Sequence, residues 1–588
     1  MQARPPRSTW CLMLLAAVST AGTSRGADPE RRVLELAPPD AACTLVVTDL
    51  RGHAARWASS PLEARVRPFL DHTRDAEPRR GLRETVTNLE RALEVSATQI
   101  RDEIFGSDVA FCLRIAPGAP PEQARGLLLT RVRDRALLGR LLARINAAGP
   151  AEGGPSRVVA RQYLGQTYQR REFDDPARPA ESYIVLDDVL AWSNDASLIE
   201  GVIEREALVD MPAGLARDPK AAKISRALGS SPFLTVLVDP RGLERLLPGA
   251  PGGPPPKPDA QPDEVRVARL LFRYLQAVEY AGATFAWGAG GFEARLAEVV
   301  APERLDAVWR PRKRAQGPTT PPLIPVAALA VAWGRVDFGR AYDLLLAVVP
   351  EEARPRFDLL LDLARGFLLD LDPRRDVLPR LGPEVLAVIE SPAADSERPL
   401  GAIAVALGYQ ERPPEAAGAR LEAALRNALR TLLVARALDV KSGPHALATS
   451  TIDGLATTSL EPTRGLAFAV TGDRALVATS PAAVGRLHAV PPSDAKRLGE
   501  RLDAALTRDL EAIARVDLER LADVVARSRG RLAGRLAERR GMRPDDAARD
   551  IDDFRAALTL FRDVEFWAAG NDDASTARFG LNLNLRGK

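Results

Sequence analysis

Residues that could do chemistry are few and scattered along the 588 residues of this chain. One serine stands between glycines, in Gly22-Thr23-Ser24-Arg25-Gly26, with the spacing of a hydrolase nucleophile. That nucleophile needs a strand, a sharp turn and a helix around it. Because the match falls at the end of an N-terminal leader, where no such turn can form, we interpret it as a chance match.

The histidines and the acidic clusters do not have the spacing of metal ligands. The four histidines, which we predict to be surface residues, are His53, His72, His445 and His488. The densest acidic stretch holds Asp545, Asp546, Asp550, Asp552 and Asp553. It lacks the turn glycine and the periodicity of a calcium loop, and it fits a helix start, where acids oppose the helix dipole. Asn571-Asp572-Asp573 predicts a hairpin tip.

One pair of neighbouring acids, Asp187 and Asp188, could serve a hydrolase as acid and base. A turn between two strands explains the pair more simply. No catalytic, cofactor-binding or metal-binding residue is therefore predicted, and we expect a protein without enzymatic activity.

The strongest run of one charge lies between residues 527 and 543. Its cations are Arg527, Arg529, Arg531, Arg535, Arg539, Arg540 and Arg543. Such a run could dock on anionic lipid or nucleic acid. Leu532 and Leu536 favour instead an amphipathic helix whose cations face solvent. The whole chain carries 81 Lys and Arg against 78 Asp and Glu, so no nucleic-acid partner is expected.

The first 27 residues have the plan of a signal peptide. Arg4 and Arg7 precede an apolar run, and small residues then fit cleavage after Ala21 or Gly26. The run is too short to cross a bilayer, which takes about 20 apolar residues. We therefore expect export to the periplasm or the exterior, without a transmembrane anchor. Cys43 and Cys112 lie in apolar runs that predict strands. Side chains alternate between the two faces of a strand, and if each strand buries its more apolar face, the two sulfurs point to opposite sides of the sheet. This disfavours a disulfide.

The same order of sequence blocks recurs at an offset of about 280 residues. Matching blocks are Cys43 to Leu50 with Leu329 to Val336, Gly106 with Gly382, Gly165 with Gly454, Asp187-Asp188 with Gly472-Asp473, Val238-Asp239 with Val516-Asp517, and Val278-Glu279-Tyr280 with Val564-Glu565-Phe566. In the last pair, a long helix is expected to end before a closing hairpin. The recurrence predicts two similar domains, residues 35–300 and 326–588.

Between the copies, residues 302–325 are rich in proline, which predicts a linker. Within the first copy, residues 248–262 form a Pro/Gly stretch that we expect to be a mobile loop. In both copies, short strands follow one another through turns, and helices follow the strands. This order predicts an α+β fold in which each domain is a mixed, largely antiparallel sheet of hairpins with packed helices.

Four segments carry a resemblance to a known family. They are Gly106-Ser107-Asp108-Val109-Ala110-Phe111, Leu127-Leu128-Leu129-Thr130-Arg131-Val132, Tyr163-Leu164-Gly165 and Tyr183-Ile184-Val185-Leu186-Asp187-Asp188. In this order they resemble an exported bacterial family catalogued only as a domain of unknown function. The resemblance covers about residues 35–300, and the second copy more faintly. It implies export and a common fold, and it brings no catalytic residue, cofactor or substrate.

Three functions follow as hypotheses. The first is an exported, non-enzymatic binding or scaffolding protein, whose partner could be another protein of the cell envelope. The second is a carrier of an apolar or lipid ligand, held in a cavity between hairpins and helices. The third and weakest is a hydrolase that uses Asp187 and Asp188.

Overall fold

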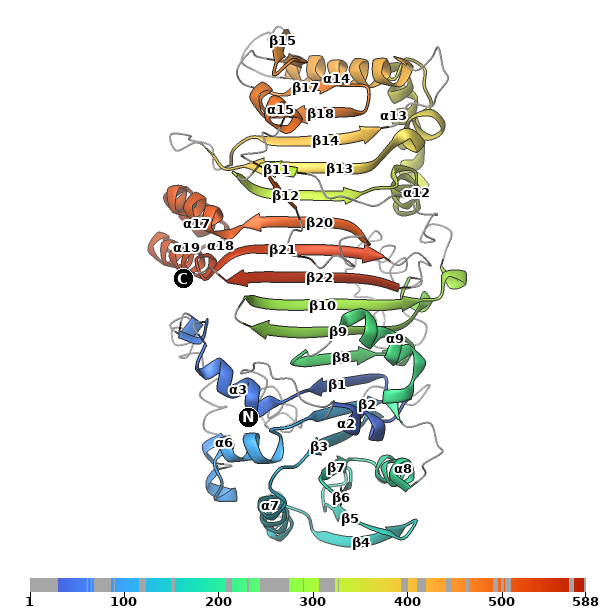
Figure 1. Cartoon of the computed structure of the whole chain (residues 1–588), viewed down its shortest axis with the longest axis vertical. Coiled ribbons are helices and arrows are strands. Elements are labelled where there is room, and N and C mark those ends of the chain that lie inside the picture. Colours follow the sequence, from blue (N-terminus) through green and yellow to red (C-terminus); the bar gives the residue numbers. More distant parts are fainter. Residues whose placement is uncertain are drawn as a thin grey trace. The chain divides into compact units, whose positions relative to one another are not determined.

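The computed structural model describes most of the chain (Figure 1). The described residues are 30–60, 62–64, 66–67, 86–88, 90–115, 123–149, 154–207, 214–229, 232–243, 274–288, 290–305, 323–325, 327–349, 351–392, 400–409, 419–439, 447–460, 465–489, 495–498, 502, 509–570 and 576–585. The expected signal peptide, residues 1–27, and the expected Pro/Gly loop, residues 248–262, lie outside them.

The described residues divide into two compact units, one holding most of residues 30–304 and the other most of residues 305–585. The division falls inside the expected linker, residues 302–325, and the structure describes both ends of that segment. Pro302–Arg304 is a turn of 3-10 helix, and β11 (Leu323–Pro325) pairs with β19 (Ala495–Arg497). Proline is tolerated in such a short, two-stranded edge pairing. The rest of the expected linker, residues 306–322, lies outside the described residues.

The sheet of unit one is built from ten strands among the described residues. In spatial order they are β4 (Arg157–Tyr163), β5 (Gln166–Glu172), β6 (Glu181–Leu186), β7 (Val189–Ser193), β3 (Arg125–Arg131), β2 (Val109–Arg114), β1 (Cys43–Val47), β8 (Leu234–Val238), β9 (Val278–Gly288) and β10 (Gly291–Val300). Each of these neighbours pairs antiparallel. Val278-Glu279-Tyr280, expected at a helix end, instead begins β9, because β-branched and aromatic residues suit a strand.

Helices cover both faces of this sheet. They are α2 (Glu30–Leu36), α3 (Leu50–Ala58), α6 (Ala97–Gln99) continued by a π-turn (Ile100–Ile104), α7 (Arg135–Ala147), α8 (Ala196–Ala207), α9 (Pro219–Leu228) and α10 (Pro240–Leu243). Because strand side chains alternate between faces, Val46 and Ala110 join the core under α2, α8 and α9. Val47 and Val109 join a second core with Leu50 of α3.

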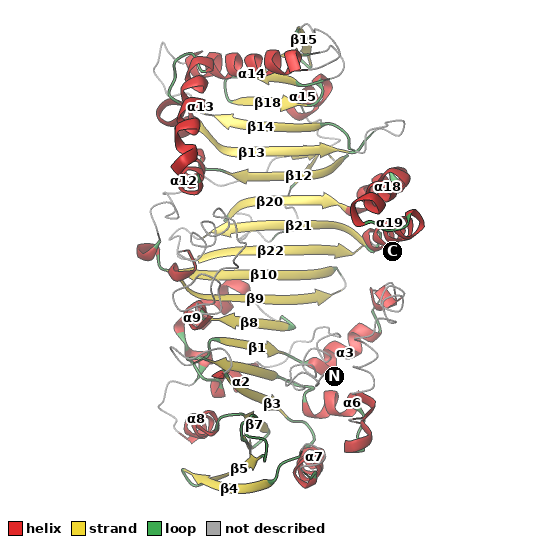
Figure 2. Cartoon of the chain, turned by 180° about the vertical axis from the view of Figure 1, so that it is seen from behind, coloured by secondary structure: helices red, strands yellow, loops and turns green. Residues whose placement is uncertain are grey.

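Unit two has its strands in a corresponding order (Figure 2). They are β15 (Ala448–Ile452), β16 (Leu455–Ser459), β17 (Ala467–Val470), β18 (Arg474–Ala478), β14 (Ile403–Tyr409), β13 (Leu381–Glu390), β12 (Ala328–Arg335), β20 (Leu510–Asp517), β21 (Phe561–Gly570) and β22 (Thr576–Leu585). The pairings from β15 to β21 are antiparallel. The α+β class predicted from sequence is confirmed.

The helices of unit two also lie on both faces of their sheet. They are α12 (Phe338–Val348), α13 (Arg354–Phe367), α14 (Ala419–Asp439), α15 (Pro481–His488), α17 (Leu518–Arg527), α18 (Arg529–Arg540) and α19 (Pro544–Leu558), with short turns at Glu351–Ala353, Pro373–Val377 and Leu378–Arg380. Val484 of α15 packs in one core with Trp333. Leu421 of α14 packs in another with Phe468.

Local sequence determines several turns and helix starts in both units. Asp49 and Asp337 cap the helices after β1 and β12, each accepting a hydrogen bond from a backbone N–H three residues on, at 3.1 and 2.9 Å. Ser480 caps α15 with Pro481 in its first turn, as the sequence predicts. Gly165 and Gly454 turn the hairpins β4–β5 and β15–β16 with φ of 78° and 80°, a region that favours glycine.

Candidate functional site

The histidines do not gather at a site. His53 is only 4% exposed and its ring lies 4.9 Å from that of Phe233, so the prediction of a surface histidine is wrong there. The cap at Asp49 fixes the start of α3, and His53, four residues after the cap, packs against Phe233. His488 is exposed in the last turn of α15, as predicted. His72 and His445 lie outside the described residues.

Asp187 and Asp188 form the turn between β6 and β7. Asp187 has a left-handed backbone with φ of 47°, which aspartate tolerates in hairpin turns. The Asp188 carboxylate accepts a hydrogen bond from Arg131 Nε at 2.6 Å. The geometry therefore supports the turn interpretation over the hydrolase hypothesis.

The acidic cluster and the basic run pair with each other. Asp552 of α19 accepts two hydrogen bonds from the guanidinium of Arg529 in α18, at 2.8 and 2.6 Å. These bonds hold the pKa of Asp552 below its usual value. The two helices also pack through Ala533, Ala537 and Ala547. This arrangement fits the predicted amphipathic helix and helix start. Asn571-Asp572-Asp573 lies outside the described residues.

The two described cysteines are free. Cys112 pairs across the β1–β2 ladder with Thr44, and Cys43 pairs with Leu113. Neighbouring pairs alternate between faces, so the sulfurs point to opposite sides, as their parity in the sequence predicts. Burial raises the pKa of the Cys112 thiol to about 12, which makes it a poor nucleophile at neutral pH.

Sequence reasoning missed two buried ion pairs, one in each unit. Arg171, 2% exposed, binds Glu181 across β5–β6, and its guanidinium lies 5.1 Å from the ring of Trp192. Burial lowers the pKa of Arg171, and Glu181 opposes that effect. In unit two, Arg515 donates to Asp563 across β20–β21 at 2.8 Å. Each charge has its partner within the sheet, so we interpret both pairs as structural.

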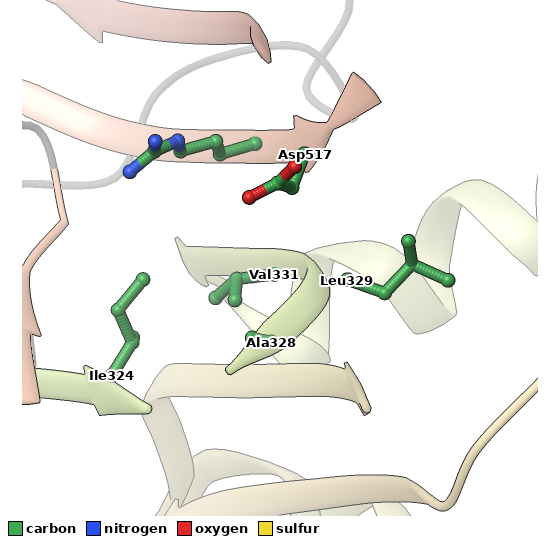
Figure 3. A pocket seen from close by; sticks show the side chains of 6 residues that line it. Ile324, Ala328, Leu329, Val331 and Asp517 are labelled. Atoms are coloured by element: carbon green, nitrogen blue, oxygen red, sulfur yellow. The ribbon is translucent and has the colours of Figure 1, made fainter. Parts of the chain in front are cut away.

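A small pocket lies beside β12 in unit two (Figure 3). Its lining residues are Ile324, Ala328, Leu329, Val331, Arg515 and Asp517. Its volume of about 10 Å³ is room for roughly one water molecule. Both polar side chains already have structural partners: Arg515 binds Asp563, and Asp517 caps α17 by accepting from Arg520 N at 3.0 Å. This pocket is not the chamber that the carrier hypothesis needs.

A group of exposed apolar side chains lies on α13. Side chains spaced three or four apart share a face of a helix, which sorts this helix into three rows. The polar row is Arg354, Asp358, Asp362 and Arg365; the half-buried row is Phe357, Leu361, Ala364 and Leu368; the third row begins at Arg356 and continues through Leu359, Leu360, Leu363 and Phe367. Only the half-buried row packs on the unit.

Leucines of the third row are exposed to solvent. Leu359, Leu360, Leu363 and Phe367 are 60, 61, 51 and 44% exposed, and no residue of α13 is fully buried. Clustered exposed apolar side chains mark interaction sites more often than scattered ones do. Sequence reasoning did not find this surface. The signal for it is an apolar arc wider than the single stripe that a surface helix needs to pack on a sheet.

Leu369 adds a fifth apolar side chain at the end of this helix. It is 44% exposed and has a left-handed backbone, with φ of 52°. The amide of Asp370 bonds back to the carbonyl of Arg365 at 2.9 Å, which is the helix ending that usually places glycine at this position. We call Leu359, Leu360, Leu363, Phe367 and Leu369 the α13 surface.

The α13 surface is anchored to the rest of unit two at both ends. The rings of Tyr342 in α12 and Phe357 lie 6.0 Å apart. Asn427 of α14 donates from its side chain to the carbonyl of Phe367 at 2.8 Å, and Leu368 packs against the core that contains Phe468. The exposed leucines therefore stand on a helix with a fixed orientation in its unit.

The helices described in unit one have no exposed apolar face like the α13 surface. Its strongly exposed large apolar residues, Leu164, Val185, Phe285 and Leu296, stand on strands or in a hairpin turn. No group of three or more His, Cys, Asp or Glu within the described ranges could hold a metal ion. None of the helices described is long and apolar enough to cross a bilayer.

The fold and this surface define a class: an α+β protein of helix-covered antiparallel sheets that exposes an apolar helix face in its second unit. No protein-family model matches the chain, and no curated protein matches it. Among solved structures, crystal forms III, IV and I of TP0453 are similar at 11, 10 and 11% identity. They cover 47, 45 and 45% of this chain and 82, 79 and 78% of that protein, with TM-scores of 0.24, 0.23 and 0.21. The function is therefore argued from this chain alone.

Proposed function

We propose that this chain is an exported, non-enzymatic binding protein that works through the α13 surface. The observation that carries the proposal is the exposure of four large apolar side chains on one face of α13. Leaving apolar area in water forgoes roughly 25 cal/mol per Å² of burial. A partner that covers this face would recover that free energy.

Export is part of the proposal and is supported by the sequence of residues 1–27, with its cations, short apolar run and small residues. A binding protein with an exposed apolar face would then meet its partner in the cell envelope. That partner would cover a helix face on the surface of unit two, rather than enter a cleft.

We also propose that the two units are copies of one unit. Three observations support this: the shared strand order, the aspartate caps at equivalent helix starts, Asp49 and Asp337, and the glycine turns at Gly165 and Gly454. The expected boundaries, residues 35–300 and 326–588, stand with this proposal. The copies then share a fold, while the docking surface belongs to the second copy.

Envelope fractionation tests the proposed function. We expect the wild-type chain, expressed in its own cells, to begin between residues 20 and 30 and to sediment with envelope material. A folded variant with Leu360→Asp and Leu363→Asp should be exported equally but should remain in the soluble fraction. A matched control, Leu438→Asp, changes a leucine that is 82% exposed on α14 and should sediment like wild type. Equal sedimentation of the α13 variant would refute a role for this surface.

A further inference from the structure

We propose that the α13 surface docks on the face of an anionic lipid bilayer. This inference rests on the proposed function and names the partner. It is carried by three features of the described residues: the sorting of charge around α13, the size of the exposed apolar face, and the choice of leucine at a strained position.

Charge around α13 is sorted in the way that an anionic surface would favour. The polar row is balanced, because Arg354 and Arg365 accompany Asp358 and Asp362. The exposed apolar row carries one cation, Arg356, and no acid. A helix lying in a membrane interface buries its apolar side chains and places cations near lipid phosphates. The apolar row of α13 meets both conditions, since both aspartates of the helix stand in the polar row, and the next acid, Asp370, lies 3.9 Å from the guanidinium of Arg365.

Arg356 is well placed to reach a phosphate. It is exposed, and it makes no ion pair within the part of the chain that the structure describes. Its aliphatic stem can lie along the neighbouring apolar side chains while the guanidinium reaches outward. The planar guanidinium can then bind phosphate oxygens in a bidentate manner. Leu359 and Leu363 follow three and seven residues later in the same row, so cation and apolar anchors act on one surface.

The size of the face fits a bilayer better than a second copy of the chain. A helix of 14 residues is about 21 Å long, and five side chains at 44 to 61% exposure make a patch of a few hundred Å². A stable protein interface buries about 800 Å² on each partner. Interfacial helices need only one apolar face, because lipid adapts to its shape.

Leu369 independently supports a binding role for the exposed apolar side chains at the end of α13. Its left-handed backbone, φ 52°, is one in which glycine is favoured over leucine, because the Cβ crowds the backbone. The fold alone would therefore prefer glycine at this helix end. Leucine at this position lowers the stability of the folded chain and adds an exposed apolar group two residues after Phe367.

Vesicle co-sedimentation of the purified full-length mature chain tests the inference. The probes are phosphatidylcholine vesicles with and without phosphatidylglycerol. We expect wild type to bind the phosphatidylglycerol vesicles and to bind them less as salt rises. Leu360→Asp with Leu363→Asp should lower the partition coefficient by more than about tenfold, while Leu438→Asp should leave it unchanged. Thermal melts will show that each variant is folded.

A charge reversal tests the role of the cation. Arg356→Glu changes the charge by two units and should weaken binding to anionic vesicles by about 25-fold, since each unit of charge near such a surface changes affinity by about fivefold. Arg354→Glu makes the same change in the polar row and should have a smaller effect. Equal effects of both substitutions would overturn the assigned orientation of α13.

Other outcomes separate this inference from the proposed function. If wild type binds neither kind of vesicle, yet its sedimentation with envelope material still depends on Leu360 and Leu363, the lipid partner is wrong and the binding function stands. A dimer in sedimentation velocity that Leu360→Asp with Leu363→Asp dissociates would make a second copy the occupant, and would also overturn the inference. If Leu360→Asp with Leu363→Asp changes neither envelope sedimentation nor vesicle binding, the proposed function fails as well.

Discussion

The two units use corresponding strand orders and differ in what their helices present to water. In unit one, the described helices direct their large apolar side chains to the cores, as Ile199 and Ile224 do. In unit two, α13 occupies the connection between β12 and β13 and leaves a row of leucines exposed. In unit one, the described part of the connection between β1 and β2 contains α3, which stands after β1 as α12 stands after β12 and buries Leu50, His53 and Ala54; residues 68–85 of this connection lie outside the described residues.

This difference teaches that the strands and the connections follow separate requirements. Strand order and helix caps are similar in both units because they stabilise the sheet and start the helices. The connection after the first central strand is free to vary, since its helix needs only one row of contacts with the sheet. Within the described residues, the connection of unit two exposes a second apolar row, and our proposal places the docking surface there.

The largest effects should come from buried aromatic residues, one in each unit. Phe468 is 3% exposed in β17, and Tyr183, 6% exposed in β6, stacks on Trp192 with ring centroids 5.0 Å apart. Replacing either by alanine should destabilise its own unit by about 3–5 kcal/mol. Thermal melts combined with hydrogen exchange will show which unit is affected. Phe566→Ala, at an exposed position, is the control. A loss of stability below about 1 kcal/mol for either substitution would contradict the view that both units depend on a packed aromatic core.

His53 provides the next effect in size. Because its ring is buried against Phe233, His53→Ala should cost about 1–3 kcal/mol of unfolding free energy. His488→Ala, at an exposed helix end, should stay within about 0.5 kcal/mol of wild type. Chemical denaturation of both variants measures the difference. Equal stability of the two variants would contradict the structural role of His53.

Loss of the two equivalent caps should be smaller and unequal. Asp337→Ala removes a cap from a residue with φ of −80° and should cost about 1 kcal/mol. Asp49 has φ of 48° and also binds Arg56 at 3.2 Å, so Asp49→Ala leaves alanine in a strained backbone and should cost up to about 2 kcal/mol. Asp49→Asn should recover most of that loss, because asparagine tolerates the left-handed region. A larger loss of stability for Asp337→Ala than for Asp49→Ala would contradict the argument from backbone strain.

The smallest effect on stability should have the opposite sign. Leu369→Gly removes strain at the end of α13 and should stabilise the chain by up to about 1 kcal/mol, while lowering its binding to anionic vesicles. A melt and a vesicle assay on the same sample measure both quantities. Leu368→Ala, in the half-buried row, should destabilise instead. If Leu369→Gly lowered stability, leucine at this position would be a structural residue.

Local chemistry in the sequence predicted much of the fold. Turn glycines at 165 and 454, the Ser480 cap and the opposite faces of Cys43 and Cys112 follow from properties of a few neighbouring residues. The Arg171–Glu181 pair could not be predicted, because it depends on the register between β5 and β6. His53 was misplaced for a similar reason: a lone histidine in a helix does not reveal which face turns inward.

The candidate site was the hardest part to predict. Leu359, Leu360, Leu361 and Leu363 make α13 look like an ordinary buried amphipathic helix. Only tertiary packing shows that Leu361 is half buried while its neighbours are exposed. Free energy of burial favours covering every apolar row, so a sequence pattern alone would place the exposed row in the core.

Hydrogen exchange of the full-length chain with and without phosphatidylglycerol vesicles tests the central claim most directly. It compares the two units in one sample and locates the contact. We expect vesicles to protect the backbone amides of residues 354–370, in and just after α13, and to leave α3 of unit one and the basic helix α18 unchanged. Protection at α18 or in unit one, with residues 354–370 unchanged, would contradict the assignment of the docking surface to α13.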